Sequence, residues 1–263
     1  MSDADPVLLD LSSGIARIRF NRPHVLNALD EHAILAFKRA VETVAGDSTV
    51  RVVVLSGEGK GFLAGGDVGR FHSAGEAAAE VVTAIITPFH EALVTLTSLR
   101  QPVIAALHGA VAGAGLSMAL AADLAIAADD AKFTLAYTKI GTSPDGGASW
   151  ALPRVVGLRK AMELALLSDV IDAAEAERIG LVNKVVPAAD LGAEVDRLAA
   201  RLAQGPTQAY GRVKALLRTS LDHALPTQLE AEKQAFLGSV GTRDFREGVA
   251  AFVEKRKSHF EGH

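Results

Sequence analysis

Two glycine-rich turns, each directly after an apolar run, are the part of this sequence best suited to chemistry. The first turn covers residues 62–67 and follows the run 51–56; the second covers residues 108–115 and follows the run 102–107. Turns without side chains expose backbone N–H groups and let a ligand approach the main chain closely. The second turn leads into a helix-like stretch, whose first N–H groups are unpaired and carry the positive end of the helix dipole. Two such donors directed at one point would form an oxyanion hole, which stabilises charge developing on a carbonyl oxygen.

Length and composition indicate a soluble globular protein with a large core. The chain has 263 residues, of which 49% are hydrophobic and 22% charged, as is typical of globular domains. Its net charge of −4 argues against nucleic acid as the main partner. It contains no cysteine, which rules out disulfides, thiolate metal ligands and a cysteine nucleophile. The eight histidines are scattered without a metal-ligand spacing, so we expect no metal site.

Neither the N-terminus nor the apolar middle of the chain predicts a membrane protein. The first residues are acidic and polar and lack the basic start and apolar core of a signal peptide, so we expect a cytoplasmic protein. Residues 102–122 carry no formal charge and are long enough to span a bilayer. They also contain three glycines, and their pattern changes at Gly109, which favours a strand, a turn and a buried helix. We therefore predict no membrane span.

Strand–turn–helix units in the first half of the chain and long helices in the second predict a layered α/β fold. Residues 7–20 alternate around Gly14 and predict a hairpin, and Asp30 is expected to cap the next helix. Further strands are expected at 51–56, 103–107, 124–127 and 182–186, and helices at 75–99, 113–122, 158–167, 172–179, 191–204, 206–223, 226–237 and 244–258. Pro88 is expected to break the helix over 75–99. We divide the chain into a core that holds the site, residues 1–195, and a C-terminal helical region, residues 196–263.

A longer series of motifs accompanies the two turns. It comprises Asn21-Arg22-Pro23, Asn27-Ala28-Leu29, Gln101-Pro102-Val103, Pro144-Asp145-Gly146-Gly147, Leu152-Pro153-Arg154, Gly180-Leu181-Val182-Asn183 and Phe245-Arg246-Glu247-Gly248. Together with the turns, this series resembles the crotonase superfamily of acyl-CoA enzymes along nearly the whole chain. The resemblance implies a ββα spiral core, a C-terminal helical region that helps to form a homotrimer or a hexamer, and a coenzyme A thioester as substrate. It implies no metal and no redox cofactor, because coenzyme A arrives as part of the substrate.

The resemblance also assigns binding residues. It places the thioester oxygen between the N–H groups of Gly66 and Ala114. It places the passage for coenzyme A along the first turn, at Ala64, Gly65, Gly66, Asp67 and Val68, close to Ala114. It places the nucleotide end of coenzyme A near Arg22, Val25 and Leu26.

The positions that distinguish the reactions of this superfamily depart from the hydratase pattern. The enoyl-CoA hydratases that this sequence resembles carry two glutamates that hold and activate water, and here those positions are Ser117 and Tyr137. Hydration needs one group to take a proton from water and another to supply a proton at the α-carbon. The loss of both carboxylates therefore argues against the ordinary hydratase mechanism. Tyr137 is expected either to donate a hydrogen bond within the pocket or to form part of its wall, and we favour the wall.

Asp145 is the candidate replacement for the missing carboxylates. The sequence around it, with Trp150 close behind, resembles the isomerase branches of the superfamily, especially the enzyme type that expands the ring epoxide in phenylacetyl-CoA breakdown. In such a site one carboxylate takes a proton from the α-carbon and returns it at the γ-carbon, and the two N–H donors hold the dienolate between these steps. Without the resemblance, an aspartate before two glycines is best interpreted as a turn residue that caps the next helix.

His90 leaves a second chemistry open. Dehalogenases acting on 4-chlorobenzoyl-CoA are also similar to this chain, and they pair a histidine here with an aspartate at the position of Asp145. In that mechanism aspartate attacks the ring carbon and histidine activates the water that hydrolyses the ester. A lone histidine on a helix is more often a packing or surface residue. The hypotheses are therefore an enoyl-CoA isomerase, which we favour, a dehalogenase-like hydrolase, a hydratase with unusual water handling, and an acyl-CoA-binding protein without catalysis.

Overall fold

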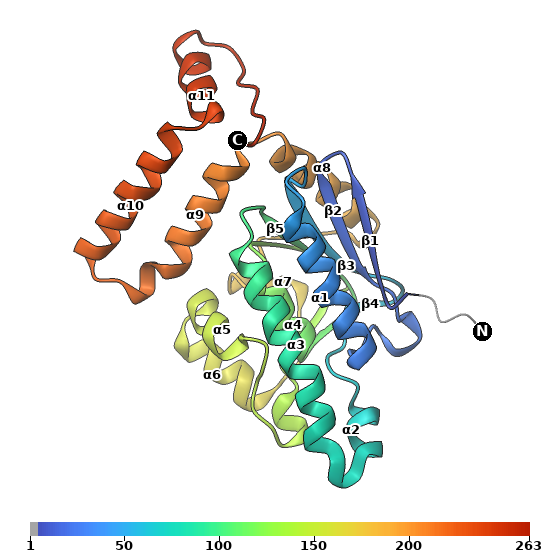
Figure 1. Ribbon diagram of the computed structural model, residues 1–263. Coiled ribbons are helices and arrows are strands. Elements are labelled where there is room, and N and C mark those ends of the chain that lie inside the picture. The colour runs from blue at the N-terminus through green and yellow to red at the C-terminus, as the bar shows by residue number, and fades with distance from the viewer. Residues whose placement is uncertain (1–4) are drawn as a thin grey trace.

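The chain winds through two β-sheets in a repeating pattern. The structure, a computed structural model, describes residues 5–263. Each repeat places one strand in a sheet of order β1-β2-β3-β5-β7-β10 and the next, shorter strand in a sheet of order β4-β6-β8-β9. The pairs are β3 (Val52–Gly57) with β4 (Gly61–Leu63), β5 (Val103–Leu107) with β6 (Ala110–Ala112), and β7 (Leu124–Ala128) with β8 (Lys132–Thr134). This alternation, with helices between the pairs, confirms the predicted α/β class and ββα spiral (Figure 1).

Most of the predicted elements are present, with ends that differ by a few residues, but the helices Val68–Ala74 and Ala148–Val156 and the short strands Lys132–Thr134 and Ile171–Asp172 were not predicted. The predicted hairpin is present, and the Asp30 carboxylate caps α1 by accepting the N–H of Ala33 at 2.8 Å. The other strands are β1 (Val7–Ser12), β2 (Ile15–Phe20), β9 (Ile171–Asp172) and β10 (Lys184–Val186). The helices are α1 (Glu31–Gly46), α2 (Val68–Ala74), α3 (Ala78–Ser98), α4 (Ala114–Ala121), α5 (Ala148–Val156), α6 (Leu158–Leu167), α7 (Ala173–Arg178), α8 (Leu191–Ala203), α9 (Thr207–Thr219), α10 (Leu225–Val240) and α11 (Arg243–Val253).

The central strands are buried on both faces, which places the site's strands in a rigid setting. Successive side chains of a strand point to opposite faces. Accordingly, Val53 and Leu55 of β3 belong to the larger hydrophobic core, while Val52 and Val54 of the same strand belong to a second core beneath α8. Parallel strands covered on both faces favour continuous β-branched runs, which is why the sequence of β3 shows no polar alternation.

Pro88 and the glycine-rich turns also differ from the prediction. Pro88 does not break its helix, because α3 runs from Ala78 to Ser98 with Pro88 inside it. The buried side chains of Ile85 and Phe89 flank the proline and pack into the core, and this tertiary packing outweighs the loss of one backbone hydrogen bond. The glycine-rich turns also contain short strands, β4 and β6, that pair with each other. Strands of three residues are too short for a periodic sequence pattern to reveal.

The C-terminal region begins later than predicted. The proposed boundary at residue 195 falls inside α8, and Val195 itself lies in the core beneath the central sheet. Helix α8 therefore belongs to the α/β core. Helices α9, α10 and α11 form an arm that extends away from this core (Figure 1). Large apolar side chains of the arm are exposed, including Leu217 at 69% and Phe252 at 86%.

The uncharged stretch 102–122, which is long enough to span a membrane, folds into buried elements. Residues 102–122 form β5, a turn, β6 and α4, and every residue of α4 is buried. A different segment, Val68–Ser98, is long and apolar enough to pass a length-and-composition test for a membrane span. This segment contains a 3₁₀ turn at Gly75–Ala77, and the α3 part packs on the core through Phe89, Leu93 and Leu96.

Candidate active site

In the first glycine turn, the N–H of Gly66 points away from Leu29, the residue that bonds to the turn from behind. Leu29 donates to the carbonyl oxygen of Gly65 at 2.8 Å and accepts the N–H of Asp67 at 2.9 Å. Backbone groups of neighbouring residues in an extended segment point in opposite directions. The N–H of Gly66 therefore points away from Leu29. Among residues 5–263 it has no hydrogen-bond partner within the protein.

The second turn places the N–H of Ala114 at the start of a buried helix. Gly113 adopts φ 52°, a conformation that glycine accepts readily, and its N–H donates to the carbonyl oxygen of Thr134 at 3.0 Å. Ala114 then opens α4, so its N–H has no partner within the helix. The two turns are in contact, since a Cβ atom added to Gly65 would lie 3.6 Å from the backbone nitrogen of Ala114. The structure thus brings together the segments of both predicted donors.

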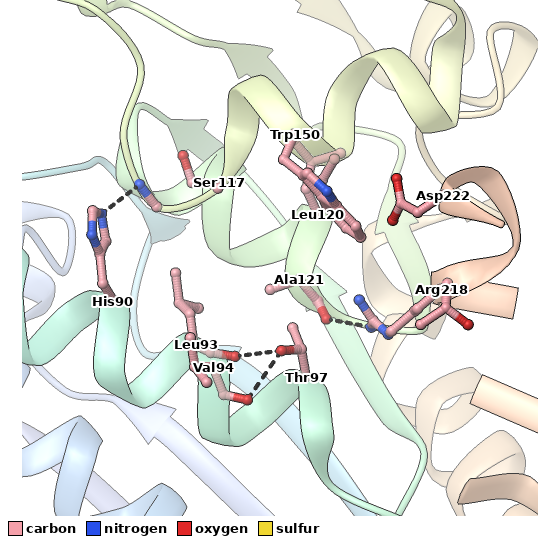
Figure 2. Close-up of a pocket in the computed structure, with 14 residues that line it drawn as sticks. His90, Leu93, Val94, Thr97, Ser117, Leu120, Ala121, Trp150, Arg218 and Asp222 are labelled. Carbon is pink, nitrogen blue, oxygen red and sulfur yellow. Dashed lines mark hydrogen bonds between the residues drawn. The ribbon is translucent and has the colours of Figure 1, made fainter. Parts of the chain in front are cut away.

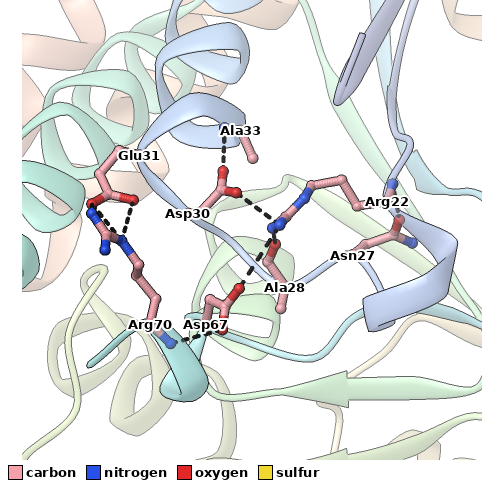
Figure 3. Close-up of polar contacts among 8 residues, drawn as sticks. All are labelled: Arg22, Asn27, Ala28, Asp30, Glu31, Ala33, Asp67 and Arg70. Carbon is pink, nitrogen blue, oxygen red and sulfur yellow. Dashed lines mark hydrogen bonds and ion pairs between the residues drawn. The ribbon is translucent and has the colours of Figure 1, made fainter. Parts of the chain in front are cut away.

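Arg22 holds the segment that supports the first turn (Figure 3). Its guanidinium donates to the carbonyl oxygen of Ala28 and lies 2.7 Å from the Asp30 carboxylate and 3.8 Å from that of Asp67. Only 17% of the Arg22 side chain is exposed. The residue predicted to approach the nucleotide end of coenzyme A is therefore engaged with the protein itself.

Asn27 completes this support from inside the core. Its side-chain amide donates to the carbonyl oxygens of Glu58, Gly61 and Phe62, at 2.9, 2.9 and 3.1 Å. Its side-chain oxygen accepts the N–H of Arg22 at 2.8 Å. Asn27 is 1% exposed and has a φ of 61°, in the left-handed region that asparagine tolerates better than most residues. It belongs to a motif that sequence analysis quoted, but its role was missed because burial cannot be seen in three consecutive residues.

The candidate acid–base group, Asp145, is held by Tyr137 and Ser117, the two residues at which the resemblance places the hydratase glutamates. The Tyr137 hydroxyl donates a hydrogen bond to the Asp145 carboxylate. The Ser117 hydroxyl donates to the Asp145 backbone oxygen at 2.9 Å and lies 3.0 Å from the Tyr137 hydroxyl. Burial, followed by the nearby Asp145 carboxylate, raises the pKa of Tyr137 above its usual value, so Tyr137 stays a neutral donor. Tyr137 is thus a hydrogen-bond donor to the carboxylate, which is the alternative that sequence analysis did not favour.

The same network lies close to the second turn. Ser117 is three residues after Ala114 in α4, and three residues advance a helix by about 4.5 Å. A Cβ atom added to Gly146 would lie 2.8 Å from Cβ of Ser117, which shows how tightly the Asp145 loop packs on this helix. The carboxylate of Asp145, held by Tyr137, and the N–H of Ala114 therefore lie in the same part of the molecule.

His90 reaches the Asp145 loop from α3. Its Nε2 atom accepts the backbone N–H of Gly146 at 3.1 Å (Figure 2). This bond requires an unprotonated Nε2, so a neutral His90 carries its proton on Nδ1. A general base must have an available lone pair near the proton that it takes, and here the lone pair of Nε2 is already used. The structure brings His90 to the predicted site, in a position suited to holding the loop.

A pocket of about 600 Å³ opens beside these residues (Figure 2). Its walls come from α3, α4, the loop before α5, α5 itself, the end of α9 and the turn after α9. They are lined by His90, Leu93, Val94, Thr97, Ser117, Leu120, Ala121, Gly146, Gly147, Trp150, Ala151, Arg218, Thr219 and Asp222. The contribution of α9 was missed, because nothing in the sequence shows that residues some seventy positions after Asp145 return to it.

An ion cluster fixes α9 against the core. Asp123 lies 2.6 Å from the Lys214 ammonium and 2.9 Å from the Arg218 guanidinium, and it also accepts the N–H of Val103 at 2.8 Å. Burial lowers the pKa of Lys214 below its usual value, although Asp123 partly opposes this effect. Asp123 thus anchors the C-terminal arm to the core.

The remaining predicted binding residues border the first turn. Asp67 caps α2 by accepting the N–H of Arg70 at 3.1 Å. Leu26 and Val68 are exposed, whereas Val25 and Ala64 are half-buried and Gly65 is buried. Within residues 5–263, no group of three or more histidine, aspartate and glutamate side chains is arranged to hold a metal ion.

Comparisons with known proteins agree with this architecture. A family model described as enoyl-CoA hydratase/isomerase matches residues 10–263. A probable enoyl-CoA hydratase from Rhodobacter capsulatus is 42% identical over 96% of both chains. The 1,2-epoxyphenylacetyl-CoA isomerase of Escherichia coli is 35% identical over 97% of this chain and 98% of its own. The crystal structure of a putative enoyl-CoA hydratase/isomerase from Mycobacterium abscessus matches with a TM-score of 0.92 and 37% identity, over 98% of this chain and 100% of the other.

The spiral of paired strands and the two apposed glycine turns define a member of the crotonase superfamily of acyl-CoA enzymes, as the sequence motifs predicted. Within that superfamily, the chain belongs to the enoyl-CoA hydratase/isomerase family.

Proposed function

We propose that this enzyme is an enoyl-CoA isomerase in which Asp145 is the acid and base and the N–H groups of Gly66 and Ala114 form the oxyanion hole. The observation that carries the proposal is the pair of hydrogen bonds by which Tyr137 and Ser117 hold Asp145. The resemblance places Tyr137 and Ser117 at the positions where hydratases carry glutamates. The contact between the two glycine turns supports the assignment of both donors to one site.

The proposed reaction moves a double bond by two proton transfers. The Asp145 carboxylate takes a proton from the α-carbon of a 3-enoyl-CoA, and the electron pair of that C–H bond delocalises onto the thioester oxygen. The two N–H groups stabilise the resulting dienolate, and one such donor contributes about 3–4 kcal/mol to lowering a barrier. Protonated Asp145 then returns the proton to the γ-carbon, which leaves a 2-enoyl-CoA. The reaction needs no separate cofactor, because coenzyme A enters with the substrate.

The bond from Tyr137 to Asp145 supports this assignment of roles. It occupies one carboxylate oxygen and fixes the plane of the group, which leaves the other oxygen for the substrate proton. Hydration would require a second acid–base group, yet the Tyr137 hydroxyl is already committed to Asp145. A dehalogenase-like hydrolysis would require His90 to release the N–H of Gly146 before it could activate water.

We also propose that the protein is a cytoplasmic homotrimer, or a pair of trimers, in which neighbouring subunits cover the C-terminal arm. The arm exposes large apolar side chains on α9, α10 and α11, among them Leu217, Phe236 and Phe252. Exposed apolar surface of this extent marks a site of association.

A substrate panel tests the proposed reaction. The purified protein is assayed with a 3-enoyl-CoA, with crotonyl-CoA and with 4-chlorobenzoyl-CoA. Isomerase activity predicts a double-bond shift in the first, whereas loss of absorbance from the second would indicate a hydratase and chloride release from the third a dehalogenase. Asp145→Asn should lower kcat for the 3-enoyl ester at least a hundredfold, since proton transfer by a positioned group contributes about 10²–10⁴-fold. Full turnover by this variant would refute the mechanism.

A further inference from the structure

Ser168, a buried serine outside the proposed chemistry, bonds to two segments of the candidate site. It directly follows α6 with a φ of 51°, the left-handed conformation in which many helices end, and it is 0% exposed. Buried polar groups are almost always hydrogen-bonded. The partners of Ser168 include two threonines, Thr134 and Thr138, which lie on either side of Tyr137 in the chain.

The contact with Thr138 holds the turn that carries Tyr137. The Thr138 hydroxyl lies 2.7 Å from the Ser168 hydroxyl, and Thr138 directly follows Tyr137 in a 3₁₀ turn. Ala136, the residue before Tyr137, has a φ of 58°, a left-handed conformation that costs free energy in alanine. A strained turn keeps its shape only where surrounding contacts fix it. The bond to Ser168 is such a contact, and Tyr137 in turn donates to Asp145.

The contact with Thr134 holds the strand that supports the Ala114 donor. The Thr134 hydroxyl donates to the Ser168 backbone oxygen at 3.0 Å. Thr134 ends β8, and its own backbone oxygen accepts the N–H of Gly113 at 3.0 Å. Because Gly113 directly precedes Ala114, a shift of Thr134 would move the N–H group that is proposed for the oxyanion hole.

We propose that Ser168 is a positioning residue that fixes the acid–base group and one oxyanion donor relative to each other. The Thr138 contact leads to the turn that holds Asp145. The Thr134 contact leads to the segment that carries Ala114. The inference rests on the proposed function for the roles of these two groups. Their relative placement matters because one takes a proton from the carbon next to the carbonyl that the other binds.

Steady-state kinetics test the proposal through the difference between kcat and KM, with the ester of the panel that the wild type turns over. Ser168→Ala removes the hydroxyl that meets Thr138 and should lower kcat about three- to tenfold, less than the roughly hundredfold loss that a misplacement of about 1 Å can cause. KM should change less than about twofold, because a fully buried serine touches no substrate. Ser239→Ala is the matched control, since the Ser239 hydroxyl also donates to a backbone oxygen, that of Ala235 at 3.0 Å on α10. Its kcat should be unchanged.

Variants of Thr138 show whether the loss runs through the bond between the two hydroxyls. Thr138→Val should lower kcat as much as Ser168→Ala does, and Thr138→Ser, which keeps the hydroxyl, should recover most of it. Since Ser168→Ala and Thr138→Val remove the same bond, the double variant should lose no more than either single variant. Thr138 is exposed, so Thr138→Val tests the same bond even if Ser168→Ala does not fold.

Variants of Thr134 test the second contact in the same way. Thr134→Val removes the hydroxyl that donates to the Ser168 backbone oxygen. It should also lower kcat about three- to tenfold with little change in KM, and Thr134→Ser should recover most of the loss. Loss of stability alone would not separate kcat from KM or follow the hydroxyl group.

Amide hydrogen exchange reports the two contacts without any turnover. Ser168→Ala and Thr138→Val should raise exchange in peptides that cover residues 136–142. Thr134→Val should raise exchange in peptides that cover residues 113–117. Ser239→Ala should leave both segments as they are in the wild type.

The outcomes separate this inference from the proposed function. Unchanged kcat in Ser168→Ala and Thr134→Val, in an enzyme that turns over its ester, would overturn the role of Ser168. Additive losses in Ser168→Ala with Thr138→Val would also overturn it. If the wild type turns over no ester of the panel, the proposed function fails. Raised exchange in both segments would then still support the positioning by Ser168, and unchanged exchange would overturn it.

Discussion

Replacing Arg22 should damage catalysis far more than substrate binding. Sequence analysis places this arginine near the nucleotide end of coenzyme A, where its loss would weaken binding. In the structure its guanidinium is bonded to Ala28 and Asp30 and lies near Asp67, directly behind the turn that carries Gly66. The backbone bonds from Leu29 to Gly65 and Asp67 transmit that position to the N–H of Gly66. Arg22 is therefore a positioning residue for one donor of the proposed oxyanion hole.

The size of the effect follows from these contacts. Hydrogen bonds to charged groups contribute about 1.5–3 kcal/mol each to stability, and the Arg22 side chain is only 17% exposed. We expect Arg22→Gln to lower the free energy of unfolding by about 2–3 kcal/mol. Removing one oxyanion donor outright costs about 10²–10³ in kcat. A donor that is displaced but still present should cost less, so we expect kcat to fall about 10- to 100-fold while KM changes less than threefold.

Steady-state kinetics would check this prediction, with the ester of the panel that the wild type turns over. The measurement is made at a temperature where the variant stays folded. Arg19→Gln is the matched control, because Arg19 lies three residues earlier in the chain, on β2, and pairs with Glu58 at 2.8 Å. Its kcat should be unchanged. Arg22→Lys should recover part of kcat. A rise in KM with unchanged kcat would refute the reasoning and restore Arg22 as a ligand of coenzyme A.

Three further predictions concern the groups around the site. Tyr137→Phe should lower kcat about tenfold by loosening Asp145. The variant should also lose less stability than the wild type as the pH rises above 10. In the wild type the raised pKa of folded Tyr137 contributes unfolding free energy that is complete below pH 10 and falls by about 1.4 kcal/mol per pH unit above it. Urea denaturation at pH 9 to 11 would measure this difference. Asp123→Ala should cost about 3–5 kcal/mol of unfolding free energy, because it leaves the buried Lys214 without its carboxylate, whereas Asp196→Ala on the exposed pair with Arg17 should cost less than about 1 kcal/mol in the same urea titration. Asn27→Ala should lower the free energy of unfolding by about 2–4 kcal/mol, since three carbonyl oxygens lose their donor. An unchanged urea midpoint would show that these hydrogen bonds do not stabilise the fold.

Much of the fold could be predicted from the sequence because local signals and tertiary packing agree there. The strand Val103–Leu107 and the helix Leu158–Leu167 have the predicted boundaries, since apolar periodicity, glycine and proline all mark their ends. Pro88 shows the limit of such signals. Proline weakens a helix locally, and only the packing of Ile85 and Phe89 shows why α3 continues through it.

The candidate site was predictable in its backbone parts and less so in its side-chain partners. The two turns are visible as glycine patterns, and their contact follows from the pairing of β4 with β6. The bond from Tyr137 to Asp145 joins positions eight apart across an irregular loop, where no period applies. The arrival of Arg218 and Asp222 at the pocket depends on the ion cluster at Asp123, which is a contact over about a hundred residues. Contacts of this kind are set by the fold as a whole.

A crystal structure with bound hexanoyl-CoA tests the central claim most directly. The account predicts that the thioester oxygen lies about 2.7–3.1 Å from the backbone nitrogens of both Gly66 and Ala114, with the Asp145 carboxylate facing the α-carbon. A thioester oxygen bonded to neither nitrogen, or an Asp145 carboxylate turned away from the α-carbon, would contradict it.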